Sequence, residues 1–278
     1  MQPSPDSLPP PLTRRRWMRR SAGALLTAGL WPGRLRAEGN GRGGDFTFVA
    51  VNDTHFCSPE CPAWFERVTA SIRALQPKPE FCLLVGDLAQ DGKQEELGPM
   101  RDILRGLDLP CHAVIGNHDY TPDGERAIYE RLFPKQINHR FEHRGWQIVG
   151  LDSSEGTKYN NTTIQPATFL WLDDELPKLD RSKPTILFTH FPLGAGIRMR
   201  PLNADDLLER FLDHNLVAAL NGHFHGFTEK KHGETVITTS KCCAISRKNH
   251  DGTQEKGYFL CTAREGTIER TFVEVTPA

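Results

Sequence analysis

The chain has 278 residues, enough for one large domain or two small ones. Hydrophobic residues make up 38% and charged residues 25%, so a core can be buried without the help of disulfides or structural metals. Seven cysteines are an odd number, which excludes a complete disulfide framework, although Cys57 and Cys61 flank a turn and could pair in an oxidising compartment.

Residues 1–37 have the features of an export signal. Arg14 and Arg15 lie in a basic stretch, the apolar run Ala22–Leu30 follows, and Leu35–Ala37 resembles a cleavage point. The apolar run is shorter than the about 20 residues that cross a bilayer. The residue order resembles the twin-arginine signal, so we expect the bacterial export machinery as a partner, a periplasmic or secreted protein, and no stable membrane anchor. A basic amphipathic helix or a membrane anchor is the alternative.

Removal of this segment makes the remaining chain acidic. Residues 1–37 contain seven arginines and one acid, so the 34 basic and 35 acidic residues of the whole chain become 27 and 34, a balance of −7. Non-specific binding of nucleic acid needs Lys and Arg to neutralise phosphates, and we do not expect it here. Any phosphate binding must be local, through metal ions or a few well-placed cations.

Residues 38–45 are glycine-rich and precede a single domain that we expect over residues 46–278. Gly39–Gly44 matches GxGxxG, but a dinucleotide site needs this motif after a strand, and here it comes before one. We therefore interpret it as a flexible linker.

In the next part of the chain, short apolar strands alternate with helical stretches, which is typical of an α/β fold. The predicted strands, with the polar residues that follow them, are Phe46–Val51 (Asp53, His55), Phe81–Val85 (Asp87), Cys111–Ile115 (Asn117, His118, Asp119), Thr185–Phe188 (His190) and Leu216–Leu220 (His223, His225). The predicted helices are Ala63–Leu75, Lys93–Gly106, Gly124–Leu132, Ala167–Leu179 and Asp205–His214.

The last third of the chain is predicted to be all β. Its strands are Gly226–Lys231, Glu234–Thr239, Gly257–Thr262 and Thr267–Val275. Successive hairpins indicate antiparallel additions that widen the sheet system into a β-sandwich.

The polar strand ends point to a ligand site. In open α/β sheets ligands bind at the carboxyl ends of the strands, so we expect these side chains to meet at one rim. Each of them alone has another explanation, because Asp and Asn favour turns and helix caps and a histidine is often a structural residue. Five consecutive strand ends of this kind are hard to explain by capping.

These motifs resemble the signature of the calcineurin-like metallophosphoesterases over roughly residues 45–262. The matching blocks are Asp53-x-His55, Gly86-Asp87, Gly116-Asn117-His118-Asp119, His190 and Gly222-His223-x-His225. The resemblance implies a four-layer α-β-β-α sandwich in a single domain. Phe169–Leu176 followed by Thr185–Pro192 is similar to the branch related to cyclic-nucleotide phosphodiesterases.

The resemblance also implies roles for the motif residues. One divalent ion is held by Asp53, His55 and His225, a second by Asn117, His190 and His223, and Asp87 bridges the two. His118 is not a ligand in this scheme; it faces the substrate, suits the role of proton donor, and has Asp119 as the carboxylate partner that fixes its tautomer and raises its pKa.

The expected chemistry agrees with these roles. Two ions about 3.5–4 Å apart stabilise the attacking and leaving oxygens of an in-line displacement, and the hydroxide that bridges them is the nucleophile. Oxygen and nitrogen ligands suit Mn, Fe, Zn, Co or Ni, and the ligand set contains no cysteine. Gln90 stands where purple acid phosphatases have an iron-binding tyrosine, so we expect a colourless enzyme.

Substrate contacts are expected from the loops at the same rim. Arg198 and Arg200, in the loop Pro192–Asn203, are candidates for binding phosphate oxygens, although solvated loop cations are the alternative. The loop Lys241–Gly257, with Arg247, is a candidate wall of the cleft.

We therefore expect hydrolysis of a small phosphomonoester or phosphodiester, with a nucleotide as one candidate substrate. The alternative is a non-catalytic metal-binding scaffold on the same fold, but such relatives lose ligands, and here every block is filled. A serine hydrolase lacks support because the chain has no GxSxG motif.

Overall fold

A computed structural model of the chain describes residues 43–57 and 59–277. The predicted export signal and most of the predicted linker lie outside these residues. At the end of the linker, the Gly44 N–H donates a hydrogen bond of 2.6 Å to the Arg144 carbonyl. Among the described residues no helix is both long and apolar enough to cross a membrane.

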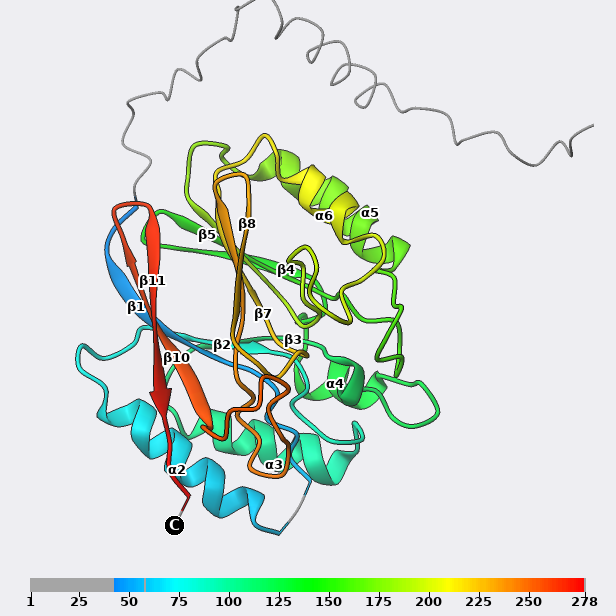
Figure 1. The fold of residues 1–278 in the computed structure, drawn as a ribbon, viewed down its shortest axis with the longest axis vertical. Coiled ribbons are helices and arrows are strands. Elements are labelled where there is room, and N and C mark those ends of the chain that lie inside the picture. The colour runs from blue at the N-terminus through cyan, green and yellow to red at the C-terminus, as the bar shows by residue number, and fades with distance from the viewer. Residues whose placement is uncertain (1–42, 58, 278) are drawn as a thin grey trace, which may run out of the picture. The chain divides into compact units, whose positions relative to one another are not determined.

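Two β-sheets form the centre of the described chain (Figure 1). The first has the order β11-β10-β1-β2-β3, in which β1, β2 and β3 are parallel, β10 is antiparallel to β1, and β11 is antiparallel to β10. Its strands are β1 (Phe46–Val51), β2 (Cys82–Val85), β3 (Cys111–Val114), β10 (Gly257–Arg264) and β11 (Thr267–Glu274).

The second sheet has the order β4-β5-β6-β7-β9-β8. Its four inner strands are parallel, and each edge strand is antiparallel to its neighbour. They are β4 (His139–His143), β5 (Trp146–Leu151), β6 (Thr185–Thr189), β7 (Leu216–Asn221), β8 (Thr228–His232) and β9 (Thr235–Thr239). Every residue of β1, β2, β5 and β6 is buried, which explains their mainly apolar sequences.

Helices cover the outer face of each sheet, on opposite sides in Figure 1. The first sheet carries α2 (Cys61–Ala74), α3 (Gln94–Arg105) and α4 (Ala127–Leu132), and the second carries α5 (Pro166–Glu175) and α6 (Ala204–Arg210). Short 3-10 turns occur at η2 (Asn117–Asp119) and η3 (Leu176–Lys178). In α2 the buried Trp64, Phe65, Val68 and Ile72 follow the helical period and form its core-facing stripe.

Three apolar clusters fill the spaces between these layers. One lies between α2, α3 and the first sheet, one between the two sheets, and one between the second sheet and α5 and α6. Phe48, Phe81 and Phe188 belong to the middle cluster, in which the rings of Phe48 and Phe81 are stacked at 4.9 Å. The predicted four-layer α-β-β-α sandwich is confirmed.

Several details differ from the sequence-based expectations. The expected strands include neither strand of the β4–β5 hairpin: β4 (HRFEH) has one apolar residue and gives no apolar run, whereas β5 (WQIVGL) has such a run and could have been predicted from it. The strand β9 is parallel to β7, so the C-terminal third is not a simple series of antiparallel hairpins. The polar strand ends come from two sheets, not from the rim of one.

Cys57 and Cys61 do not form a disulfide; the Cys57 backbone N–H lies 3.5 Å from the Cys61 sulfur.

Within each sheet, the parallel ladders align the ends that carry the motif residues. Val85 pairs with Val114 in the first sheet, and Thr189 pairs with both Leu151 and Asn221 in the second. Because parallel strands end at the same edge, the motif residues form one row on each sheet. The site forms where these two rows meet.

Candidate metal centre

Hydrogen bonds join the two rows directly. The His223 backbone N–H, after β7, donates to the Asp53 carboxylate, after β1, at 3.0 Å. His190, after β6, places its Nδ1 at 3.0 Å from the carbonyl oxygen of Val85, the last residue of β2. Each bond connects the carboxyl edge of one sheet to that of the other, so the site is fixed by both sheets.

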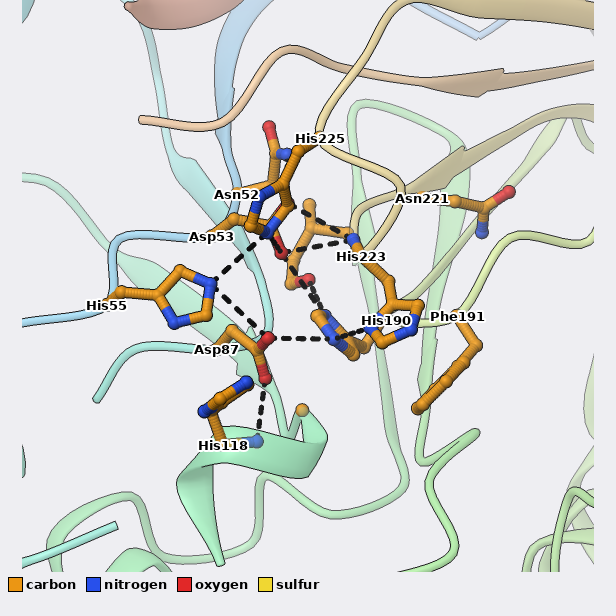
Figure 2. Close-up of polar contacts among 12 residues, drawn as sticks. Asn52, Asp53, His55, Asp87, His118, His190, Phe191, Asn221, His223 and His225 are labelled. Carbon is orange, nitrogen blue, oxygen red and sulfur yellow. Dashed lines mark hydrogen bonds and ion pairs between the residues drawn. The ribbon is translucent and has the colours of Figure 1, made fainter. Parts of the chain in front are cut away.

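Six of the seven expected metal ligands form two groups of candidate donors. The first group contains Asp53, His55, Asp87 and His225, and the second contains Asp87, His190 and His223; all are buried. Asp87 belongs to both groups, and Figure 2 shows its carboxylate between the His55 ring and the His190 ring. The grouping is the one that the motifs implied, with Asp87 in the shared position.

The distances between donor atoms are short and regular. The Nε2 atoms of His55 and His225 lie 3.2 Å apart, and Nε2 of His190 lies 3.1 Å from Nδ1 of His223. The Asp87 Oδ2 atom is 3.5 Å from the His55 Nε2 and 3.2 Å from the His190 Nε2. One carboxylate oxygen therefore faces both histidine pairs.

These separations fit divalent ions. Two donors that each lie about 2.1 Å from one ion are roughly 3.0–3.4 Å apart at tetrahedral or octahedral angles. The Asn117 Oδ1 atom is buried without a hydrogen-bond partner, as expected of an amide oxygen that serves as a ligand. His118, the next residue, donates its backbone N–H to the Asp87 Oδ1 at 2.9 Å, which places Asn117 beside the shared carboxylate.

Backbone carbonyls orient two of the ligand histidines. A carbonyl oxygen can only accept, so Nδ1 of His190 donates to Val85 and Nε2 of His223 donates to the Tyr159 carbonyl at 2.8 Å. The other ring nitrogen of each histidine then faces Asp87 and its partner ring. Metal-binding histidines have this arrangement, because the outer hydrogen bond fixes the tautomer and the ring orientation.

The backbone of the ligand turns is strained. Most of the candidate ligands have a positive φ, a region that non-glycine residues rarely adopt. These residues are Asp53 (53°), His55 (40°), Asp87 (53°), His223 (64°) and His225 (47°). Such conformations persist where the surrounding structure imposes them, and they concentrate at functional sites.

Two motif glycines leave space for ligands of neighbouring blocks. Gly86 has φ 82°, and a Cβ there would lie 2.6 Å from the His190 Nδ1. A Cβ at Gly116 would overlap the Asp87 carboxylate. The Gly-Asp and Gly-Asn pairs are thus required by close packing around the site as well as by the turns.

The acidic and basic groups of the site stabilise each other's charged forms. Burial alone would raise the pKa values of Asp53 and Asp87, but His225 and His190 hold them well below the usual range. Burial alone would lower the pKa values of these two histidines. The adjacent carboxylates reverse this: Asp87 raises the pKa of His190 to about 9, and Asp53 raises that of His225 to about 11.

The other two histidines are neutral. Burial lowers the pKa of His55 well below its usual value and that of His223 to about 4. Each close histidine pair therefore shares one proton near neutral pH. A metal ion must displace these protons, because a ligating nitrogen cannot carry one.

His118 lies at the edge of the centre, as expected, but the structure corrects the expected role of Asp119. His118 Nδ1 is 2.7 Å from the Gln90 carbonyl, which fixes its tautomer, and its ring centroid is 4.7 Å from that of His55. The buried Asp119 carboxylate instead accepts the backbone N–H groups of Gly116 and Ala89, both at 2.9 Å. In the η2 turn its side chain folds back to cap the turn, so it does not reach the imidazole.

Only one of the two expected substrate arginines faces the open space beside the centre. A cavity of about 590 Å³ is lined by Tyr159, Asn160, Arg198, Met199 and His250. It borders the ligands, because the Tyr159 carbonyl accepts from His223 and the His250 ring is stacked 5.2 Å from that of His225.

Arg200 does not line this cavity. Its Nε donates to the Leu193 carbonyl at 2.8 Å, and its Nη2 pairs with Asp205 at 2.6 Å. These bonds hold the loop against α6, so the expectation of a phosphate contact is corrected to a structural role.

Arg247 and Gln90 also reach the site. Arg247 Nη2 donates to the Gln90 Oε1 at 2.6 Å and lies 3.5 Å from the His118 Nε2. The sequence predicts Arg247 only as part of a cleft wall and Gln90 only as the replacement of an iron-binding tyrosine. No motif marks either residue, because the contact joins segments 157 positions apart.

The fold and the paired donor groups define a dinuclear metal site in a phosphoesterase-type sandwich. The family model of calcineurin-like phosphoesterases matches residues 46–227, and the chain belongs to this family. It is a metal-dependent hydrolase of phosphoric ester bonds with a dinuclear centre for divalent ions.

Named relatives support the branch inferred from the motifs. A probable glycerophosphodiester phosphodiesterase of Arcobacter nitrofigilis is 28% identical over 210 residues, which cover 69% of this chain and 76% of that protein. A probable cyclic nucleotide phosphodiesterase of a Synechococcus strain is 31% identical over 156 residues, covering 54% and 59% of the two chains. A dimetal phosphatase from Danio rerio shares the fold, with a TM-score of 0.58, 14% identity and coverage of 83% and 99%.

Proposed function

We propose that the chain hydrolyses a phosphodiester at the centre that Asp87 shares between two histidine pairs. The observation that carries this proposal is the Asp87 Oδ2 atom, which faces His55 at 3.5 Å and His190 at 3.2 Å. A single oxygen in this position is suited to bridge two ions. The names of both relatives given above, each a phosphodiesterase, favour a diester over a monoester as substrate.

The proposed ligands follow the two donor groups. Asp53, His55 and His225 would hold one ion, and Asn117, His190 and His223 would hold the other; Asp87 would contribute to both groups. Bound divalent ions supply Lewis-acid charge that activates water and stabilises the phosphoryl oxygens. Manganese, iron, zinc, cobalt and nickel all suit this set of oxygen and nitrogen donors.

His118 protonates the leaving oxygen. Its Nδ1–H is held by the Gln90 carbonyl, which leaves Nε2 as the ring nitrogen for the leaving oxygen. A protonated Nε2 donates to the leaving alkoxide, which is a poor leaving group without a proton. Asp119 acts indirectly, since its bonds to Gly116 and Ala89 hold the turn that carries His118.

The alcohol part of the substrate occupies the adjacent cavity. Tyr159 and His250 offer ring faces there, Asn160 offers an amide, and Arg198 offers a cation. Ring faces, an amide and a cation together suit an organic group that has both apolar and polar parts. A nucleotide is one such substrate.

A comparison of two simple substrates tests the proposal. Purified protein loaded with Mn²⁺ should hydrolyse bis(p-nitrophenyl) phosphate faster than p-nitrophenyl phosphate, and a chelator should abolish both activities. Metal analysis should find two ions per chain. A protein that holds two ions and cleaves neither substrate would instead be a non-catalytic scaffold.

We also propose that residues 1–37 direct export to the periplasm through the twin-arginine route and that no stable anchor remains. The support is the sequence Arg14-Arg15 before the short apolar run Ala22–Leu30. In a bacterial host, the full chain should appear in the periplasm with a new N-terminus near Ala37. Replacing Arg14 and Arg15 by lysine should retain it in the cytoplasm; unchanged export would refute this route.

A further inference from the structure

We infer that Arg247 is a substrate-binding residue that holds a phosphoryl oxygen beside His118, and that Gln90 positions it. This inference rests on the proposed phosphoesterase function and adds a protein cation to the metal charge. Arg247 lies outside every motif that carries the metal ligands and comes from the segment between β9 and β10.

The charge of Arg247 has no carboxylate partner among the described residues. Its Nη2 donates to the Gln90 Oε1 at 2.6 Å and lies 3.5 Å from the His118 Nε2, and Nε and Nη1 have no partner among these residues. The other half-buried arginines of the described chain each form an ion pair, namely Arg101–Asp102, Arg126–Asp152, Arg140–Glu175, Arg200–Asp205, Arg210–Asp173 and Arg270–Glu229. A half-buried guanidinium held by a neutral amide keeps its full charge for an incoming anion.

The position of Arg247 is built into the fold. The segment that leads to it is bonded to the end of β1: the Cys243 N–H donates to the Asn52 carbonyl and the Ala244 N–H to the Asp53 carbonyl, both at 3.0 Å. Trp64 of α2 donates its indole N–H to the Cys243 carbonyl at 2.8 Å. The loop is therefore anchored to the same strand end that supplies the ligand Asp53.

The position of Arg247 fits a phosphate ester at the centre. Its Nη2 lies 3.5 Å from the Nε2 of His118, the atom that we propose as the proton donor to the leaving oxygen. A guanidinium presents its donors in a planar fork that matches two phosphoryl oxygens, and two donor nitrogens remain available. Gln90 contributes twice, since its carbonyl fixes His118 and its side chain fixes Arg247.

Binding of inorganic phosphate and hydrolysis of bis(p-nitrophenyl) phosphate together test this inference on the Mn²⁺-loaded protein. In Arg247→Met we expect the phosphate Kd and the substrate KM to rise about 10- to 100-fold, with a smaller fall in kcat, as for the loss of charge-assisted hydrogen bonds. Arg247→Lys should restore part of the loss, because it keeps the charge without the fork. Lys231→Met, which removes an exposed cation from β8, is the control for net charge.

A double variant tests the role of Gln90. Gln90→Leu should raise the phosphate Kd several-fold in the wild-type background and have little further effect in Arg247→Met, because its side chain acts through the arginine. Phosphate binding in Arg247→Met equal to that of the wild type, or loss of metal from this variant, would overturn the inference. A wild type that binds phosphate through Arg247 but hydrolyses no ester would overturn the proposed function and leave the inference intact.

Discussion

The turns that carry the metal ligands and the loops that border them are held in different ways. The ligand side chains are buried, and hydrogen bonds connect their turns across both sheets, as from the His223 backbone N–H to the Asp53 carboxylate at 3.0 Å. In the bordering loops, Tyr159 is 66% exposed, and Arg198 and His250 are exposed as well. The two regions therefore have different tasks. The ligand turns determine whether ions bind, and the bordering loops can change substrate specificity without disturbing the ion-binding residues.

Removal of Asp87 should have the largest effect, because this residue belongs to both donor groups. We expect Asp87→Ala to lose both ions and to reduce hydrolysis to the level of the metal-free protein. Metal analysis and activity with added Mn²⁺ measure the two effects. Asp91→Ala, which removes an exposed carboxylate paired with Lys93, is the matched control. Two retained ions in Asp87→Ala would show that the carboxylate does not bridge.

Removal of His118 should separate binding from chemistry. We expect His118→Ala to keep both ions and to lose about 10²- to 10⁴-fold in kcat on a diester with an alkoxide leaving group. With p-nitrophenolate as the leaving group the loss should be much smaller, since that oxygen needs no proton. Equal losses on the two substrates would assign His118 to substrate binding and exclude a proton donor.

The pH dependence of metal binding tests the proton sharing in the turns. The pKa values of His190 and His225 are raised to about 9 and about 11, so both carry protons at neutral pH and metal binding must release them. Mn²⁺ affinity at each of the two donor groups should therefore rise by about tenfold per pH unit below pH 9, because one proton competes at each group. Calorimetry in buffers of different ionisation enthalpy counts the protons. A pH-independent affinity would contradict the shared protons.

The same pKa shifts predict that the folding stability of the metal-free protein falls as the pH rises, whereas its Mn²⁺ affinity increases. A raised histidine pKa stabilises the folded state, and for His190 this contribution is complete below pH 6.5 and lost as the pH rises through about 9. The metal-free protein should thus melt at lower temperature at pH 9.5 than at pH 6.5. In the metal-loaded protein, by contrast, ion binding adds more stability as the pH rises.

The candidate metal ligands could be predicted from the sequence because each lies within one to four residues of the end of a mainly apolar strand. This prediction did not require the strand order, since the carboxyl ends of parallel strands lie at the same edge of a sheet in any order. The expectation of one rim was wrong in detail because β1–β3 and β6–β7 belong to different sheets. The partner of Asp119 was also wrong, because a carboxylate next to a histidine in sequence can cap its own turn, as this one does.

The bordering loops could not be predicted, because tertiary contacts alone determine their positions. Arg198 and Arg200 are two residues apart and chemically identical, yet Asp205 holds one while the other lines the cavity. Arg247 meets Gln90 across 157 positions, with no pattern in either segment. Strand β4 could not be predicted for a related reason: it is a partly exposed edge strand, so its sequence is mostly polar.

Replacement of Arg198, in the bordering loops, should have the smallest effect on hydrolysis, and it tests whether these loops act independently of the ligand turns. Its guanidinium is exposed and lies 5.7 Å from the centre of the Phe224 ring, so solvent screens its charge. We expect Arg198→Met to raise KM for a bulky diester about three- to tenfold and to leave kcat and both ions unchanged. Arg200→Met should lower the melting temperature without this change in KM, since Arg200 holds the loop to Asp205. If Arg198→Met instead lost metal, the bordering loops and the ligand turns would not have separate roles. The residues that line the cavity would then also be needed for ion binding.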